Sequence, residues 1–81
     1  MKFSRYFVEQ VLLKRPYIRL EWLGRGVLPE LTVERQPDGR IKVWVYIESE
    51  DKFLRIVYLE DGKTVHNAFF DRGYKGSKHE T

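Results

Sequence analysis

The chain contains no cysteine and only three prolines among its 81 residues, and it has no long uninterrupted apolar run. The absence of cysteine excludes disulfide bonds and thiolate zinc sites, and it makes a reducing compartment the natural setting. A membrane-spanning helix needs roughly 20 apolar residues, and the first residues show no signal-peptide pattern. We therefore expect a soluble, cytoplasmic protein that does not enter a membrane.

The composition favours one small folded domain. Hydrophobic residues make up 42% and aromatic residues 15% of the chain, and such a composition favours folding over disorder. A chain of 81 residues is near the lower limit for a self-sufficient core. We expect a single domain over residues 1–75 and a flexible tail over residues 76–81. The net charge of +3 is by itself weak evidence for a nucleic-acid partner.

The first third of the chain has helical spacing. Its apolar stripe consists of Phe3, Phe7, Val8, Val11 and Leu12. Ser4 is a suitable N-cap, and the cations and proline at residues 14–16 favour a helix end. A second, shorter helix is expected over residues 18–23, because glycines and a proline follow it.

From residue 31 onward the apolar period changes to two. The segments QPDGR (36–40), ESED (48–51) and EDGK (60–63) are turn signals, and they cut this part into four strands. The expected fold class is α+β, with two N-terminal helices packed on a four-stranded antiparallel sheet in the order 1-2-3-4.

The turns fix a register, and the register divides the side chains between two faces. A turn at Asp61-Gly62 pairs Tyr58 with Val65, and it places Asn67 on the core side. The core face then holds Leu31, Val33, Ile41, Val43, Val45, Ile47, Leu54, Ile56, Val65 and Phe69. The opposite face holds Thr32, Glu34, Lys42, Trp44, Tyr46, Phe53, Arg55, Val57, Leu59, Thr64, His66, Ala68 and Phe70. We expect the two helices to cover the core face.

Several site chemistries are excluded by the residues present. The two histidines have no paired carboxylate spacing beside them, so a metal site is not expected. The GRG segment at 24–26 lacks the length and the Lys-Ser/Thr ending of a phosphate loop. The three serines lie at a helix start, a turn and the tail, which does not suit a nucleophile triad. No cofactor is expected.

The opposite face is both basic and aromatic. Metal-free cleavage of RNA by its own 2′-hydroxyl needs a proton-transfer group and cations for the phosphate. Arginine suits the phosphate, histidine suits proton transfer, and exposed aromatic rings suit unpaired bases. The candidates for these roles are Lys42, Trp44, Tyr46, Arg55, His66, Arg72, Tyr74 and Lys75.

Each candidate also has a purely structural reading. Arg55 could pair with a nearby glutamate or lie along Trp44. His66 could be a hydrogen-bonding residue only, and Trp44 and Tyr46 could be covered by the C-terminal segment or by a partner. The segment after residue 72 could be a frayed end.

The segments RPYIRLEWL, QPDGRIKVWVYI and LRIVYLEDGKTVHNAFFDRGYK, in a chain expected to have two helices and then a meander, resemble the RelE/ParE toxin superfamily. The small BrnT-like and related uncharacterised bacterial branch is the most similar, and the resemblance covers about residues 5–75. An N-terminal strand is common in that superfamily, but residues 2–15 here have helical spacing.

The resemblance implies a toxin of a type II toxin–antitoxin system that cleaves mRNA without a metal, often on the ribosome. It implies a cognate antitoxin as partner, with RNA or the ribosome as target. The resemblance matches Arg55 to the superfamily's strand arginine, and it matches His66, Tyr74 or Lys75 to its C-terminal catalytic positions. Catalytic roles therefore fall to Arg55, His66 and Tyr74, and RNA or phosphate contacts to Lys42, Trp44, Tyr46, Arg72 and Lys75.

A second function class stays open. A non-catalytic binding module, or an inhibitor such as one that blocks gyrase, would dock a protein partner through the exposed sheet face. Trp44, Tyr46, Val57 and Phe70 are the apolar residues expected to form that docking patch. Where the antitoxin is missing, a homodimer through the same patch is expected.

Overall fold

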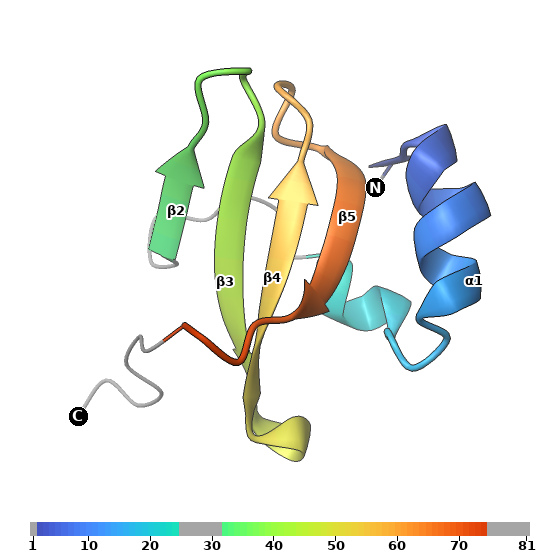
Figure 1. Cartoon of the computed structure of the whole chain (residues 1–81), viewed down its shortest axis with the longest axis vertical. Coiled ribbons are helices and arrows are strands. Elements are labelled where there is room, and N and C mark those ends of the chain that lie inside the picture. The colour runs from blue at the N-terminus through green and yellow to red at the C-terminus, as the bar shows by residue number, and fades with distance from the viewer. Residues whose placement is uncertain (1, 25–31, 75–81) are drawn as a thin grey trace.

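Five strands form one mixed sheet in the order β1-β5-β4-β3-β2 (Figure 1). The structure is a computed structural model, and it describes residues 2–24 and 32–74. The strands are β1 (Lys2–Phe3), β2 (Thr32–Arg35), β3 (Ile41–Ile47), β4 (Lys52–Tyr58) and β5 (Thr64–Phe70). The expected tail over residues 76–81 and Lys75, the candidate for an RNA or phosphate contact, lie outside the described residues.

The expected fold class, two helices on a four-stranded antiparallel sheet, is wrong. Residues 2–24 and 32–74 contain one helical stretch longer than a single turn, made of the π-helical turn η1 (Phe7–Val11) and α1 (Leu12–Lys14). The residues expected to form a second helix contribute only the single 3-10 turn η2 (Leu20–Leu23). Arg19 just before it is extended, with ψ of 132°, so the short apolar stripe there lacks the length that makes a helix self-supporting.

The sheet also contains an N-terminal strand, which the helical spacing of residues 2–15 did not predict. β1 pairs in parallel with β5, placing Lys2 opposite Thr64 and Phe3 opposite Val65. Phe3 therefore belongs to a strand and stacks on Phe7 with ring centroids 5.3 Å apart. Ser4 follows as the cap, because its Oγ accepts the backbone N–H of Phe7 at 3.0 Å.

The antiparallel meander from β2 to β5 is confirmed. Thr32 to Arg35 pair with Trp44 to Ile41, which includes the expected pair Val33 and Val43. Gly39 and Gly62 adopt positive φ values of 92° and 68°, as the Pro-Asp-Gly and Asp-Gly turn signals require. The turn between β3 and β4 is the 3-10 turn η3 (Glu48–Glu50).

A β-bulge at His66 corrects the expected face assignment of β5. Tyr58 pairs with Val65 as expected, but Val57 then pairs with Asn67, so His66 is the extra residue. An extra residue reverses the alternation beyond it. Phe69 and Asn67 therefore belong to the outer face, and Ala68 and Phe70 to the core face. The bulge keeps the Asn67 amide out of the apolar core.

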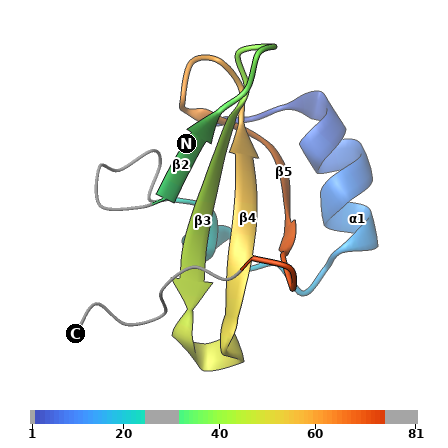
Figure 2. The same cartoon turned by 60° about the vertical axis from the view of Figure 1, so that its left-hand side comes forward.

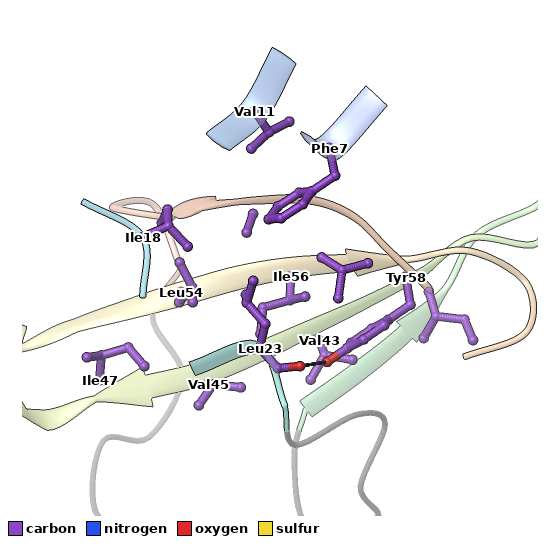
Figure 3. Close-up of a cluster of buried hydrophobic side chains, with 13 residues drawn as sticks. Phe7, Val11, Ile18, Leu23, Val43, Val45, Ile47, Leu54, Ile56 and Tyr58 are labelled. Carbon is purple, nitrogen blue, oxygen red and sulfur yellow. Dashed lines mark hydrogen bonds between the residues drawn. The ribbon is translucent and has the colours of Figure 1, made fainter. Parts of the chain in front are cut away.

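The core lies between the sheet and the helical elements. Figure 3 shows Phe7 and Val11 projecting from the helical stretch onto the strands. Four residues of the expected core face, Val43, Val45, Ile56 and Val65, are at most 1% exposed. Tyr58 lies among them and donates its hydroxyl proton to the carbonyl of Leu23 at 3.1 Å (Figure 3). This hydrogen bond fixes η2 against the sheet.

The opposite, outer face of the sheet carries the segment that follows β5. Figure 2 shows the helical stretch on one side of the sheet and residues 71–74 on the other. The backbone N–H of Asp71 bonds to the carbonyl of Phe53 at 2.9 Å, which holds the start of this segment against β4. Among the described residues, no helix is long and apolar enough to cross a membrane.

Candidate functional site

Asp71 gathers two side chains of the outer face. Its Oδ2 accepts hydrogen bonds from Arg55 Nη2 at 2.7 Å, Arg55 Nε at 3.1 Å and Trp44 Nε1 at 3.0 Å. The Asp71 and Arg55 side chains are only 13% and 25% exposed. The hydrogen bond from Trp44, followed by those from Arg55, lowers the pKa of Asp71. Asp71 is therefore ionised near neutral pH, and it offsets the charge of Arg55.

Aromatic rings enclose the same arginine. The Arg55 guanidinium lies 4.6 Å from the Phe69 ring centroid and 5.7 Å from that of Trp44. Tyr74 then covers Trp44, with its ring stacked at 4.9 Å, and it meets Phe53 edge-on at 4.9 Å. We call Trp44, Arg55, Asp71 and Tyr74 the Asp71 clasp. Arg55 lies near the Trp44 ring, as its structural interpretation has it, but its acidic partner is Asp71 and not a glutamate. Trp44 is covered by Tyr74 of the C-terminal segment, as its structural interpretation has it.

Two further candidates, Tyr46 and Arg72, lie near the η3 end of the sheet. The Tyr46 hydroxyl donates to Asp51 Oδ1, and this hydrogen bond raises the pKa of Tyr46. Arg72 is exposed and lines a depression of about 290 Å³ together with Phe53 and Tyr74. The docking patch expected from the sequence is broken up, because Tyr74 covers Trp44 and Phe70 lies on the core face.

A second depression, of about 410 Å³, lies toward the opposite end of the outer face. We call it the His66 depression, and its lining residues are Tyr6, Gln36, Asp38, Arg40, Lys42, Val57, His66 and Asn67. The register explains part of this grouping, because Lys42 pairs with Val57 and Val57 with Asn67 across three strands. The bulge then places His66 beside this row.

Two neighbours fix the His66 ring. Its Nδ1 lies 2.9 Å from Ser4 Oγ, and the Tyr6 ring stacks on it with centroids 4.9 Å apart. Burial, and then the charge of Arg40, lowers the pKa of His66 from the usual 6.5. The ring is therefore mostly neutral at pH 7 in the free protein.

The two cations of the His66 depression have only loose acidic partners. Lys42 Nζ lies 3.9 Å from Glu34, and Arg40 Nε lies 3.9 Å from Asp38. The side chains of Glu34 and Asp38 are 59% and 60% exposed, so water screens both pairs strongly. A phosphate could compete for these cations far more easily than for Arg55.

The structure separates residues that the sequence had grouped. His66 and Lys42 share the His66 depression, whereas Arg55, Trp44 and Tyr74 belong to the Asp71 clasp. In the register Arg55 pairs with Phe69, three residues beyond His66, so Arg55 and His66 do not form one catalytic site as the sequence predicted.

Sequence reasoning missed Tyr6, Arg40 and Ser4 as neighbours of His66. Arg40 directly follows the Pro-Asp-Gly turn, so its place just before β3 could be predicted from the sequence. Ser4 and Tyr6 come from the other end of the chain, and no local signal links them to β5.

Chemically, the His66 depression combines an imidazole, two cations and an aromatic ring. Such a set can bind a phosphate and transfer a proton. The described residues contain no group of three or more His, Cys, Asp or Glu side chains placed to share a metal ion. No family model, curated protein or solved structure matches the chain.

Proposed function

We propose that this chain is the toxin of a type II toxin–antitoxin pair and that it cleaves RNA at the His66 depression. One observation carries the proposal: His66 lines the same depression as Arg40 and Lys42. The toxin assignment rests on the resemblance of the sequence to the RelE/ParE superfamily. The N-terminal strand β1, common in that superfamily, supports it.

The reaction would proceed through the RNA's own 2′-hydroxyl. The 2′-oxygen bonds to the adjacent phosphorus and the bond from phosphorus to the 5′-oxygen breaks, which leaves a 2′,3′-cyclic phosphate. The 2′-hydroxyl proton passes to water, and His66 gives a proton to the leaving 5′-oxygen. An arriving phosphate favours the imidazolium form that this step requires.

Lys42 and Arg40 would hold the phosphate. Charge builds on its oxygens during the reaction, and fixed cations in a partly enclosed site stabilise that charge. Tyr6 is 48% exposed while stacked on His66, so its outer side is open to a base, and such stacking is worth roughly 1–3 kcal/mol. Arg55 has no role in this scheme beyond holding Asp71.

Cleavage of a single-stranded RNA in the presence of EDTA tests the proposal. His66→Gln should lower the rate by roughly 10²–10⁴, the range for loss of a proton-transfer group. Lys42→Ala should lower it by roughly 10²–10³, the range for loss of a fixed donor. Lys14→Ala, which removes an equal charge from an exposed helical position, is the matched control and should cut normally.

Expression of the wild type or of Lys14→Ala should arrest growth, and expression of His66→Gln or Lys42→Ala should arrest it much less. Co-expression of the gene next to this one, the expected antitoxin gene, should relieve the arrest. A folded wild type without cleavage, or undiminished cleavage in both His66→Gln and Lys42→Ala, would refute the proposal.

A protein-docking function remains the second candidate, and a different observation favours it. Leu13, Tyr17 and Leu20 are 77%, 53% and 47% exposed, and they fall within eight consecutive residues on the helical side of the sheet. Exposed apolar side chains of this kind suit a partner surface. If Leu13→Ser and Leu20→Ser abolish capture of the neighbouring gene's product while RNA is never cut, docking is the function.

A further inference from the structure

Ser4, which follows β1 near the N-terminus, contacts His66 on β5. The parallel pairing of β1 with β5 aligns Phe3 with Val65, and the backbone N–H of Ser4 bonds to the carbonyl of Val65 at 2.9 Å. The next residue on β5 is His66, the extra residue of the bulge. Strand register and bulge together therefore bring Ser4 Oγ to 2.9 Å from His66 Nδ1.

The direction of this hydrogen bond follows from the partners of Ser4. Its Oγ already accepts the N–H of Phe7 at 3.0 Å, so one lone pair is used as the helix cap. The hydroxyl has a single proton, and among the described residues His66 Nδ1 is the acceptor within reach of it. Donation by Ser4 satisfies both groups, whereas donation by His66 would leave the serine proton without a protein acceptor.

We propose that Ser4 is a positioning residue that keeps neutral His66 in the tautomer with its proton on Nε2. His66 then presents an N–H donor to an anion in the His66 depression, beside Lys42 and Arg40. This inference rests on the proposed function only in the choice of a phosphate as that anion. The tautomer itself is a property of the free protein.

The arrangement explains how a histidine that is neutral when free can still recognise an anion. A neutral imidazole with a free lone pair on Nε2 would repel a phosphate oxygen, whereas Nε2–H donates to it. No described residue bonds to Nε2, so its proton is available to a ligand. Among the other residues that line the depression, Arg40 and Lys42 are cations and Asp38 is an acid. The net charge there is positive, which favours an anion.

Histidine nitrogen spectra read the tautomer directly. His79 is the only other histidine, so a His79→Asn background leaves His66 as the single signal. In this background, the protein with Ser4 and the Ser4→Thr protein both have a hydroxyl at position 4. Both should show the His66 proton on Nε2 at pH 8. Ser4→Asp keeps a strong helix cap, but a carboxylate only accepts hydrogen bonds, so it should move the proton to Nδ1.

Inorganic phosphate tests the consequence of the tautomer. Titration should shift the His66 signals with equal affinity in the background protein and in Ser4→Thr. Ser4→Ala, which adds no charge, should bind phosphate several-fold to roughly tenfold more weakly, the range for one lost hydrogen bond of ordinary strength. If Ser4→Ala fails to fold for want of its cap, the Thr and Asp variants decide the question.

If Ser4 served only as the helix cap, the Ser4→Asp protein would show the same His66 tautomer as the background protein. That result would overturn the inference. A proton on Nδ1 in the background protein, or phosphate that leaves its His66 signals unmoved, would do so too. Absence of RNA cleavage with the expected tautomer and phosphate response would instead refute the proposed function alone, because neither spectrum depends on activity.

Discussion

Single residues decide which cations on the outer face can meet a ligand. Arg55 and Lys42 lie on neighbouring strands and point to the same side of the sheet, yet their surroundings differ. Arg55 is fixed by the partly buried carboxylate of Asp71 at 2.7 Å, whereas Lys42 has a well exposed glutamate at 3.9 Å. Arg55 therefore organises the C-terminal segment, and Lys42 remains able to bind an anion.

Replacing Asp71 with asparagine should destabilise the protein at neutral pH by roughly 1.5–3 kcal/mol, the usual worth of hydrogen bonds to a charged group. The folded pKa of Asp71 is lowered from 3.8. Its contribution is therefore fully present above the unfolded pKa and disappears as the pH falls through the lower folded value. Denaturant unfolding from pH 7 to pH 2 measures this.

The wild-type and Asp71→Asn stabilities should converge at the acid end. Asp61, whose pKa hydrogen bonds from Thr64 lower to about 2, is present in both proteins, so the difference isolates Asp71. Two curves that stay parallel down to pH 2 would show that the clasp does not depend on charge.

The pKa of His66 should rise when Arg40 is replaced by alanine. Burial lowers this pKa first and the charge of Arg40 lowers it further. Removal of the cation leaves only burial, so the titration midpoint of His66 should move upward toward 6.5 without reaching it. Proton NMR of the ring in the His79→Asn background measures the midpoint.

Arg35→Ala removes an equal charge from an exposed position on β2 and is the control for the Arg40 experiment. A His66 midpoint that is equal in the Arg40→Ala and Arg35→Ala proteins would mean that Arg40 does not act on the imidazole.

At the scale of elements, the turns could be predicted from the local sequence, whereas the pairing of strands that lie far apart in the chain could not. The turns were predictable because Gly39 and Gly62 supply positive φ values that few other residues adopt. β1 was not, because its partner Thr64 lies at the other end of the chain and Phe3 fits a helical stripe equally well. Tertiary pairing here overrides the local period.

The sequence contains an indication of the bulge that is overlooked when strict alternation of β5 is assumed. His66 and Asn67 are two consecutive polar residues between Val65 and Ala68, and unbroken alternation would bury the Asn67 amide. One extra residue avoids this cost. The same extra residue brings His66 to Ser4, so a correct register was needed before the candidate site could be predicted.

The contact between η2 and the sheet can be tested through one hydroxyl. Tyr58→Phe should destabilise the protein by roughly 1–3 kcal/mol, because it leaves the buried carbonyl of Leu23 without its donor. Tyr17→Phe is the same chemical change at a position that is 53% exposed, and it should alter stability by less than about 0.5 kcal/mol. Thermal and denaturant unfolding compare the two.

Equal effects of Tyr58→Phe and Tyr17→Phe would show that the hydrogen bond of Tyr58 contributes nothing to the packing of η2 against the sheet.

At the scale of the whole molecule, the sheet separates two kinds of surface. The core face is covered by the helical stretch and η2, with buried apolar side chains from β3, β4 and β5 and the partly buried Val33 of β2. The outer face is divided between the Asp71 clasp, where charge is compensated, and the His66 depression, where two cations have weak partners. A net charge of +3 spread over 81 residues offers little general attraction for nucleic acid.

This charge distribution predicts a shallow salt dependence of RNA binding. Each phosphate neutralised on a single strand contributes about −0.7 to the slope of log affinity against log salt. If Arg40 and Lys42 each meet one phosphate, the slope for a short single-stranded RNA should be about −1.4. Lys42→Ala should reduce the magnitude of this slope by about 0.7. Lys14→Ala should leave the slope unchanged, because Lys14 lies on the helical stretch and not in the depression.

Fluorescence anisotropy with His66→Gln protein, which should bind RNA without cutting it, gives the slopes. A much steeper slope that both lysine variants reduce equally would mean that RNA meets the whole basic surface, and it would remove the His66 depression as the binding site.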